Sequence, residues 1–133
     1  MPTDNTDTVE DRTVPDSEFT GRIIGLLFQV HNAVGPGYQE KYYQRAFERQ
    51  LEEANIPYKR ELHFPIKFKE KSIGRYFVDF LIDDQLVVEL KVSETIRLHY
   101  FKQVLGYLRH SGVKLGLIAC FGEKGVALKR VIT

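Results

Sequence analysis

Two short apolar runs in the second half of the chain contain charged residues that a sheet interior does not need. The runs cover residues 76–82 and 87–92, and the charged residues in them are Asp79, Glu89 and Lys91. An unpaired charge that is removed from water costs several kcal/mol or changes its protonation state. We therefore expect these three residues to form a site that can bind a divalent cation and a phosphate.

The pattern of helical and extended segments predicts the α/β class, as a sandwich in which a mixed central sheet has helices on its faces. Apolar residues recur at helical spacing up to Val34, and Gly35-Pro36-Gly37 ends that helix. The expected elements, in the order ααβββαββ, are a helix ending at Val34, a helix over 39–55, strands over 58–68, 73–82 and 86–92, a helix over 96–110, and strands over 114–121 and 126–132.

Composition indicates one globular domain behind an acidic tail. The chain has 133 residues, enough for one domain with a hydrophobic core. Residues 1–18 carry a net charge of −5 and few large apolar side chains, which predicts a disordered tail, whereas the domain over 19–133 carries +6. The sequence shows neither a membrane-spanning run nor a signal peptide, so we expect a cytoplasmic protein without a membrane partner.

Whether the three charged residues meet depends on the register of the hairpin that joins the two runs. Glu89 and Lys91 are two residues apart in one strand and therefore share a face. Asp79 reaches that face if it pairs with Glu89, which requires a loop with an odd residue count, such as Asp83-Asp84-Gln85. A two-residue turn would pair Asp79 with Val88 and separate the carboxylates. We expect the odd loop.

Two carboxylates and a lysine on one face suit metal-assisted hydrolysis of a phosphodiester. Neighbouring carboxylates repel each other, and a hard cation such as Mg²⁺ relieves the repulsion. The ion can lower the pKa of a bound water, and Lys91 offers a compact cation to the charge that develops on the phosphate. The plainer alternative is a Glu89–Lys91 ion pair on a solvated face, with Asp79 as a strand-end residue.

The same residues resemble a known group of nucleases. Asp79 followed by Glu89-Leu90-Lys91 is similar to the D…(D/E)xK core of the PD-(D/E)xK nuclease superfamily, with Val78 in place of the usual proline. Residues 37–43 match the motif that names the GxxExxY protein family, a prokaryotic-type branch of that superfamily, and residues 30–36 resemble its usual lead-in. Further segments are similar to the QxxxY signature of related nucleases (103–107) and to the family's C-terminal strands (116–122 and 129–130).

The resemblance implies a restriction-endonuclease-like fold and a role for each matching residue. It implies that Asp79 and Glu89 bind Mg²⁺ or Mn²⁺, with the Leu90 carbonyl and Glu40 as further ligands, and that Lys91 is the catalytic lysine. The implied substrate is nucleic acid, DNA in preference to RNA. Glu40 also lies where a carboxylate suits the first turn of a helix, so a capping role is the alternative for this residue.

Other residues are candidates for contacts with the substrate. Gln103 and Tyr107 are four apart on one helix face, so they could act in catalysis by orienting Lys91 or contact the sugar–phosphate backbone. Their alternative is ordinary helix amphipathicity. Four basic residues surround a turn and could grip a nucleic-acid backbone, although such clusters are usually solvated hairpin tips: Lys67, Lys69, Lys71 and Arg75.

The main hypothesis is a small metal-dependent nuclease. Two alternatives from other classes stay open: a nuclease-fold module that binds nucleic acid without cleaving it, and a protein-interaction or dimerisation domain whose charged cluster is a relic. The sequence contains no Walker-type loop, GxSxG elbow or CxxC pair, which leaves nucleotide cofactors, serine nucleophiles and zinc unsupported. A chain of this size wraps little duplex, so selectivity would need a homodimer, a partner protein or a structured substrate.

Overall fold

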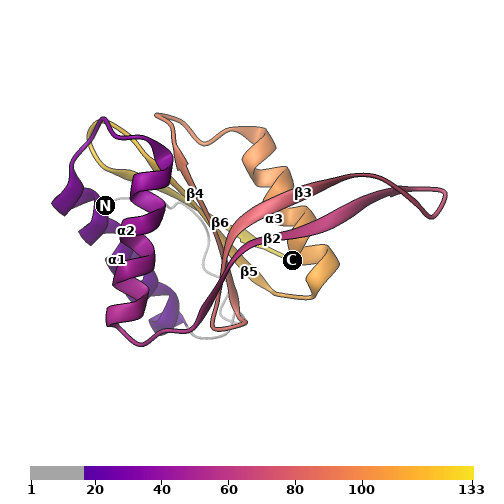
Figure 1. Cartoon of the computed structure of the whole chain (residues 1–133), viewed down its shortest axis with the longest axis horizontal. Coiled ribbons are helices and arrows are strands. Elements are labelled where there is room, and N and C mark those ends of the chain that lie inside the picture. Colours follow the sequence, from indigo (N-terminus) through magenta and orange to yellow (C-terminus); the bar gives the residue numbers. More distant parts are fainter. Residues whose placement is uncertain (1–16) are drawn as a thin grey trace.

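In the computed structural model, which describes residues 17–133, helices cover both faces of a five-stranded mixed sheet (Figure 1). The elements are α1 (Ser17–Val34), α2 (Glu40–Glu53), β2 (Tyr58–Phe68), β3 (Lys71–Ile82), β4 (Leu86–Val92), α3 (Leu98–Ser111), β5 (Leu115–Phe121) and β6 (Val126–Ile132). The α/β class and the order ααβββαββ expected from the sequence are confirmed. Most of the expected tail lies outside the described residues, but α1 begins at Ser17, so residues 17 and 18 are helical.

The sheet has the strand order β2-β3-β4-β5-β6. Neighbouring strands are antiparallel except β4 and β5, which run parallel and are joined through α3. A parallel pair needs such a crossover, because no tight turn can reverse the chain twice. In Figure 1, α3 covers one face of the sheet, and α1 and α2 lie together on the other.

Two clusters of buried apolar residues pack the helices against the sheet, one on each face. On one face, the α2 residues Tyr43, Phe47 and Leu51, spaced by four, pack with Phe80 of β3 among others. On the other, Val104 and its neighbours in α3 pack against β3, β4 and β5. Because both faces are covered, β4 and β5 are buried along almost their whole length. No helix among residues 17–133 is long and apolar enough to cross a membrane.

Strands β2 and β3 continue as a two-stranded ribbon beyond the part of the sheet that the helices cover (Figure 1). Residues 71–77 of β3 are all exposed, whereas the strand becomes buried from Val78 onward, apart from the half-buried Asp79. The backbone pairing with β2 is interrupted opposite Asp79, at Glu61, whose φ of 54° lies in the left-handed region. The ribbon therefore leaves the body of the molecule at the residue that the sequence identified as a site candidate.

Candidate active site

Strands β3 and β4 bring the predicted acidic residues together at the point where the two strands part. Their backbone pairing ends at Phe80 and Val88, in a register that closes over the three-residue loop 83–85. This confirms the odd loop expected from the sequence, and it puts Asp79 opposite Glu89.

Beyond the last backbone pair, carboxylate side chains accept the hydrogen bonds that join β3 to β4. The Asp79 N–H donates to Glu89 Oε1 at 2.9 Å, and the Leu90 N–H donates to Asp79 Oδ2 at 2.8 Å. Each acid thus satisfies a backbone donor of the opposite strand, which a buried N–H requires. Glu89 is 1% exposed and Asp79 half-buried, so the two carboxyl groups meet in a largely desolvated place.

Lys91 joins this pair from the same strand face as Glu89. Its Nζ lies 3.3 Å from Glu89 Oε2 and 3.9 Å from Glu40 Oε2. The other oxygen of Glu40, at the first residue of α2, accepts a hydrogen bond from the Val92 N–H at 3.0 Å. The ring of Tyr100 in α3 lies beneath the ammonium group, 5.7 Å from its centroid. Four of the site residues expected from the sequence are therefore brought together, with Tyr100 added to them.

The electrostatics of the cluster follow from burial and from the closeness of the acids. Burial raises the pKa of Asp79, and the Lys91 ammonium offsets only part of that shift. Burial first, and then the charge of Asp79, raise the pKa of Glu89 to about 8. For Lys91, burial lowers the pKa, but Glu89, Asp79 and Glu40 together outweigh it, so the pKa is raised. Lys91 therefore stays an ammonium at neutral pH, while Glu89 holds a proton that it would not hold in water.

The donors at this cluster suit a hard divalent cation. Burial and the charge of Asp79 together leave a proton on the Glu89 carboxyl group at neutral pH. A divalent cation can replace that proton, and Mg²⁺ commonly binds through one or two carboxylates while keeping several waters. Within residues 17–133, however, no three His, Cys, Asp or Glu side chains are grouped to hold a metal ion. The Glu40 carboxylate instead contacts the Val92 N–H and the Lys91 ammonium. The ligands expected from the sequence are therefore not all assembled around one cation position.

A second layer of polar side chains, not expected from the sequence, supports the backbone at Asp79 and at Leu90, the residue after Glu89. Gln44, one helical turn after Glu40 in α2, donates to the Leu90 carbonyl at 3.4 Å. Arg60 in β2 donates through Nε to the Asp79 carbonyl at 3.1 Å and through a terminal nitrogen to Gln44 Oε1 at 3.2 Å. Its remaining nitrogen pairs with Glu48 of α2 at 3.0 Å. The i, i+4 spacing of Glu40 and Gln44 was the only sign of this layer in the sequence.

Gln103 and Tyr107 lie in different surroundings from those expected. Gln103 Nε2 donates to the Phe77 carbonyl at 3.2 Å, so it holds the β3 backbone two residues before Asp79. Tyr107 is buried and packs edge-on against Phe64, with ring centroids 6.1 Å apart. Burial and then the charge of Asp84 raise the pKa of Tyr107. Glu40, Glu89 and Tyr100 contact Lys91 in this structure, and a role of Gln103 and Tyr107 in orienting Lys91 or contacting the sugar–phosphate backbone stays a prediction.

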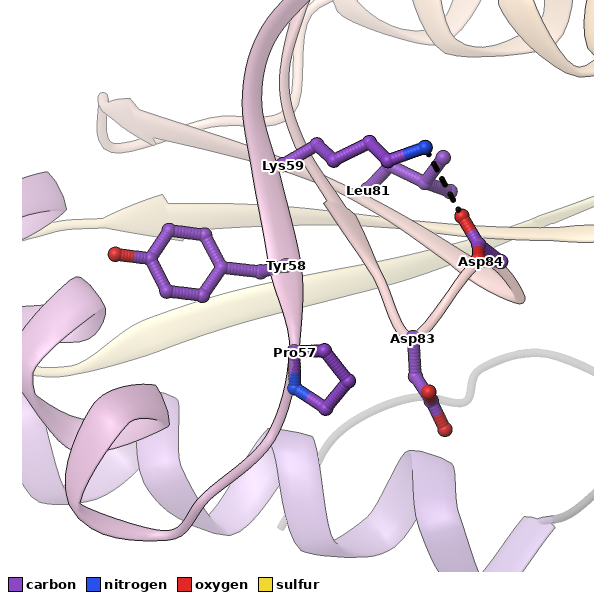
Figure 2. A pocket seen from close by; sticks show the side chains of 6 residues that line it. All are labelled: Pro57, Tyr58, Lys59, Leu81, Asp83 and Asp84. Carbon is purple, nitrogen blue, oxygen red and sulfur yellow. Dashed lines mark ion pairs between the residues drawn. The ribbon is translucent and has the colours of Figure 1, made fainter.

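A small pocket lies at the opposite end of the β3–β4 hairpin (Figure 2). It is lined by Pro57, Tyr58, Lys59, Leu81, Asp83 and Asp84, and has a volume of about 70 Å³. Lys59 and Asp84 form an ion pair of 3.5 Å across its rim. Pockets for small molecules usually have several hundred Å³, so this hollow is too small to hold a nucleotide. The acidic cluster lies where the two strands part, not at this loop.

A mixed sheet between helices, with an Asp–Glu–Lys cluster where two central strands diverge, is the arrangement of a restriction-endonuclease-like domain. The family model described as PD-(D/E)XK nuclease superfamily matches residues 17–131, so the chain belongs to that superfamily. Members typically use a divalent metal and act on nucleic acid. The finer assignment to the GxxExxY family stays a prediction.

Comparison with solved structures supports the fold. A chain described as "Crystal structure of SSO0001" superimposes with a TM-score of 0.57 at 16% sequence identity, covering 95% of this chain and 70% of that chain. At this identity the likeness concerns the fold alone. No curated protein matches the sequence.

Proposed function

We propose that this protein hydrolyses phosphodiester bonds in nucleic acid, DNA in preference to RNA, with Mg²⁺ or Mn²⁺ as its cofactor. The main support is the pair of largely desolvated carboxyl groups, Asp79 and Glu89, which face each other beside the Lys91 ammonium in a chain of a nuclease superfamily. Stability alone does not explain this cluster, because apolar residues in place of buried ionic groups are often neutral or stabilising.

Each residue has a role in this proposal that follows from its contacts. Asp79 and Glu89, together with the Leu90 carbonyl, would hold the cation. When bound, the cation supplies a water of lowered pKa and positive charge next to the phosphate. Lys91 keeps its proton because its acidic neighbours raise its pKa, so its ammonium can stabilise negative charge on the phosphate. Glu40 fixes the position of that ammonium from the start of α2.

Gln103 and Arg60 would act as positioning residues. Both donate to backbone carbonyls of β3: Gln103 to Phe77, two residues before the acidic residue, and Arg60 to Asp79 itself. They hold the strand in place at the point where its pairing with β4 has ended. Loss of either is expected to lower the turnover rate more than the affinity for substrate.

The test is cleavage of plasmid DNA, linear duplex, single-stranded DNA and RNA in the presence of Mg²⁺ or Mn²⁺. We expect metal-dependent cleavage of DNA that falls by about a hundredfold or more in Asp79→Asn, Glu89→Gln and Lys91→Ala. Asp83→Asn is the matched control, because it removes an exposed carboxylate at the far end of the same hairpin, and it should cleave like the wild type.

Three outcomes would contradict the proposal. The first is cleavage that persists in EDTA, and the second is an equal loss of activity in the Asp83→Asn control. The third is retained binding without any turnover at saturating Mn²⁺, which would identify the protein as a binding module instead.

A further inference from the structure

The exposed end of the β2–β3 hairpin is a projecting two-stranded ribbon; we call residues 66–77 the arm (Figure 1). Its two strands stay paired from Ile66 and Gly74 to the tip, with one irregularity in the register after Ile66. The base of the arm is fixed to the body, since the Phe77 carbonyl accepts a hydrogen bond from Gln103 of α3. Phe77, the β3 residue at the base of the arm, is two residues before Asp79. The base of the arm therefore lies next to the acidic cluster.

The arm combines positive charge with exposed apolar side chains. It contains four basic residues and one acidic residue, Glu70, which gives it a net charge of +3. Its large apolar side chains face solvent rather than a core: Phe68 is 61% exposed, Ile73 67%, Tyr76 43% and Phe77 49%. Exposed apolar side chains that gather on one projecting segment can mark an interaction surface. The combination suits a partner that is both polyanionic and has flat apolar surfaces.

A nucleic acid fits this description better than a second copy of the chain. Two arms in contact would bring a charge of +3 against another of +3, which opposes association. Phosphates, by contrast, attract the basic side chains, and base and sugar edges accept the aromatic ones.

The dimensions of the arm favour duplex DNA among nucleic acids. Residues 66–68 of β2, at about 3.3 Å per residue, extend the ribbon roughly 10 Å beyond the body, in which Phe64 is still buried. The major groove of B-DNA, about 12 Å wide, admits a two-stranded β-ribbon. The major groove of A-form RNA is too narrow for side chains to enter, and a single strand offers no groove.

We propose that the arm docks in the major groove of a DNA duplex and so holds a phosphate backbone against the acidic cluster. The inference rests on the proposed function for nucleic acid as the substrate, and it adds duplex DNA as the substrate class and the arm as its binding element.

The experiment measures the affinity of the full chain for a labelled DNA duplex, for its single strand and for an RNA duplex, in EDTA over a range of salt concentrations. We expect the DNA duplex to bind most tightly. In the arm variant, Lys67, Lys69, Lys71 and Arg75 are replaced by Ala. We expect this variant to bind the duplex about tenfold or more weakly. The slope of log K against log salt should decrease in magnitude by roughly two to four units.

The matched control removes four exposed basic residues elsewhere: Arg49, Lys59, Lys114 and Lys124. It should change the salt slope by less than about one unit. A charge-preserving variant with Lys67→Arg, Lys69→Arg and Lys71→Arg should bind the duplex like the wild type. Circular dichroism and thermal melting of each variant show whether it is folded, and light scattering gives its mass.

Several results would overturn the inference: an arm variant that binds like the wild type, an equal loss in the control, single-stranded DNA or RNA binding as tightly as duplex DNA, or a dimer that the arm variant dissociates. Loss of duplex affinity in the charge-preserving variant would also overturn it.

Failure of the proposed function looks different: the arm-dependent binding of duplex persists, but no cleavage occurs with any metal. Conversely, metal-dependent cleavage that does not depend on the arm overturns the arm inference alone.

Discussion

The raised pKa of Glu89 gives the folded protein a stability that depends on pH, and Glu89→Gln should remove most of that dependence. Glutamine has the shape of the protonated acid, and its carbonyl oxygen can still accept the hydrogen bond from the Asp79 N–H. It cannot lose a proton. The substitution therefore preserves the neutral state of this position at every pH.

The direction and size of the effect follow from proton linkage. The pKa of Glu89 is about 8 in the folded protein, against 4.5 for an unperturbed glutamate. Between these values the folded state retains a proton that the unfolded state has lost, so the free energy of unfolding falls as the pH rises, by about 1.4 kcal/mol per unit. From pH 5 to pH 8 the free energy of unfolding of the wild type should fall by roughly 3 kcal/mol, whereas that of Glu89→Gln should not show this fall.

Urea denaturation in EDTA at intervals between pH 5 and pH 8 measures this difference. The quantity to compare is the slope of the free energy of unfolding against pH, because the substitution also changes the 3.3 Å contact with Lys91 Nζ and so shifts the absolute value. The control is Glu53→Gln, which removes an exposed carboxylate at the end of α2 and should leave the wild-type slope. Parallel profiles for the wild type and Glu89→Gln would refute the reasoning.

Four further predictions concern the metal, the supporting layer, the arm and the core. Mg²⁺ should raise the urea midpoint of the wild type at pH 8, because a ligand of the folded state stabilises it, and it should leave Glu89→Gln unchanged; equal shifts would count against the site. Arg60→Lys should lower the free energy of unfolding by about 1–3 kcal/mol, since a lysine cannot donate to Asp79, Gln44 and Glu48 together; an unchanged urea midpoint would show that these bonds contribute nothing. Glu70→Gly should stabilise the protein by about 1 kcal/mol in the same assay, since Glu70 has a φ of 68°, and a loss of stability would contradict the turn geometry. Cys120, which is 1% exposed and whose pKa is raised to about 12 chiefly by burial, should react with a thiol reagent only on unfolding; fast labelling of the native protein would contradict its burial.

The sequence predicted the order of elements and the register of the central hairpin for physical reasons. Apolar periodicity distinguishes helices from strands, and glycine and proline mark where they end. The register followed from the cost of charge, because only the odd loop lets Asp79 and Glu89 share a desolvated place. Boundaries were less accurate: the third helix begins at Leu98, not at residue 96, because Arg97 is still extended, with φ −90° and ψ 149°.

The surroundings of the third helix depend on packing that no local pattern encodes. Tyr100 and Tyr107 lie on one stripe, but seven residues of helix span about 10 Å. One end of the stripe therefore reaches Lys91 while the other packs against Phe64. Arg60 likewise joins three elements that meet only in the folded chain. Its contacts could not be read from β2 alone.

The arm was only half visible in the sequence. The basic residues around the turn were evident, but Tyr76 and Phe77 read as the start of a buried central strand. The structure shows them exposed, since β3 becomes part of the covered sheet only at Val78. An apolar run does not reveal how much of a strand the helices will cover.

Diffraction from crystals of the wild type soaked in Mn²⁺, with data collected for anomalous scattering by manganese, tests the central claim most directly. The account predicts an anomalous peak between the carboxyl groups of Asp79 and Glu89, next to the Leu90 carbonyl, and no such peak in crystals of Glu89→Gln. Wild-type crystals at saturating Mn²⁺ with no anomalous peak between these two carboxyl groups would contradict it.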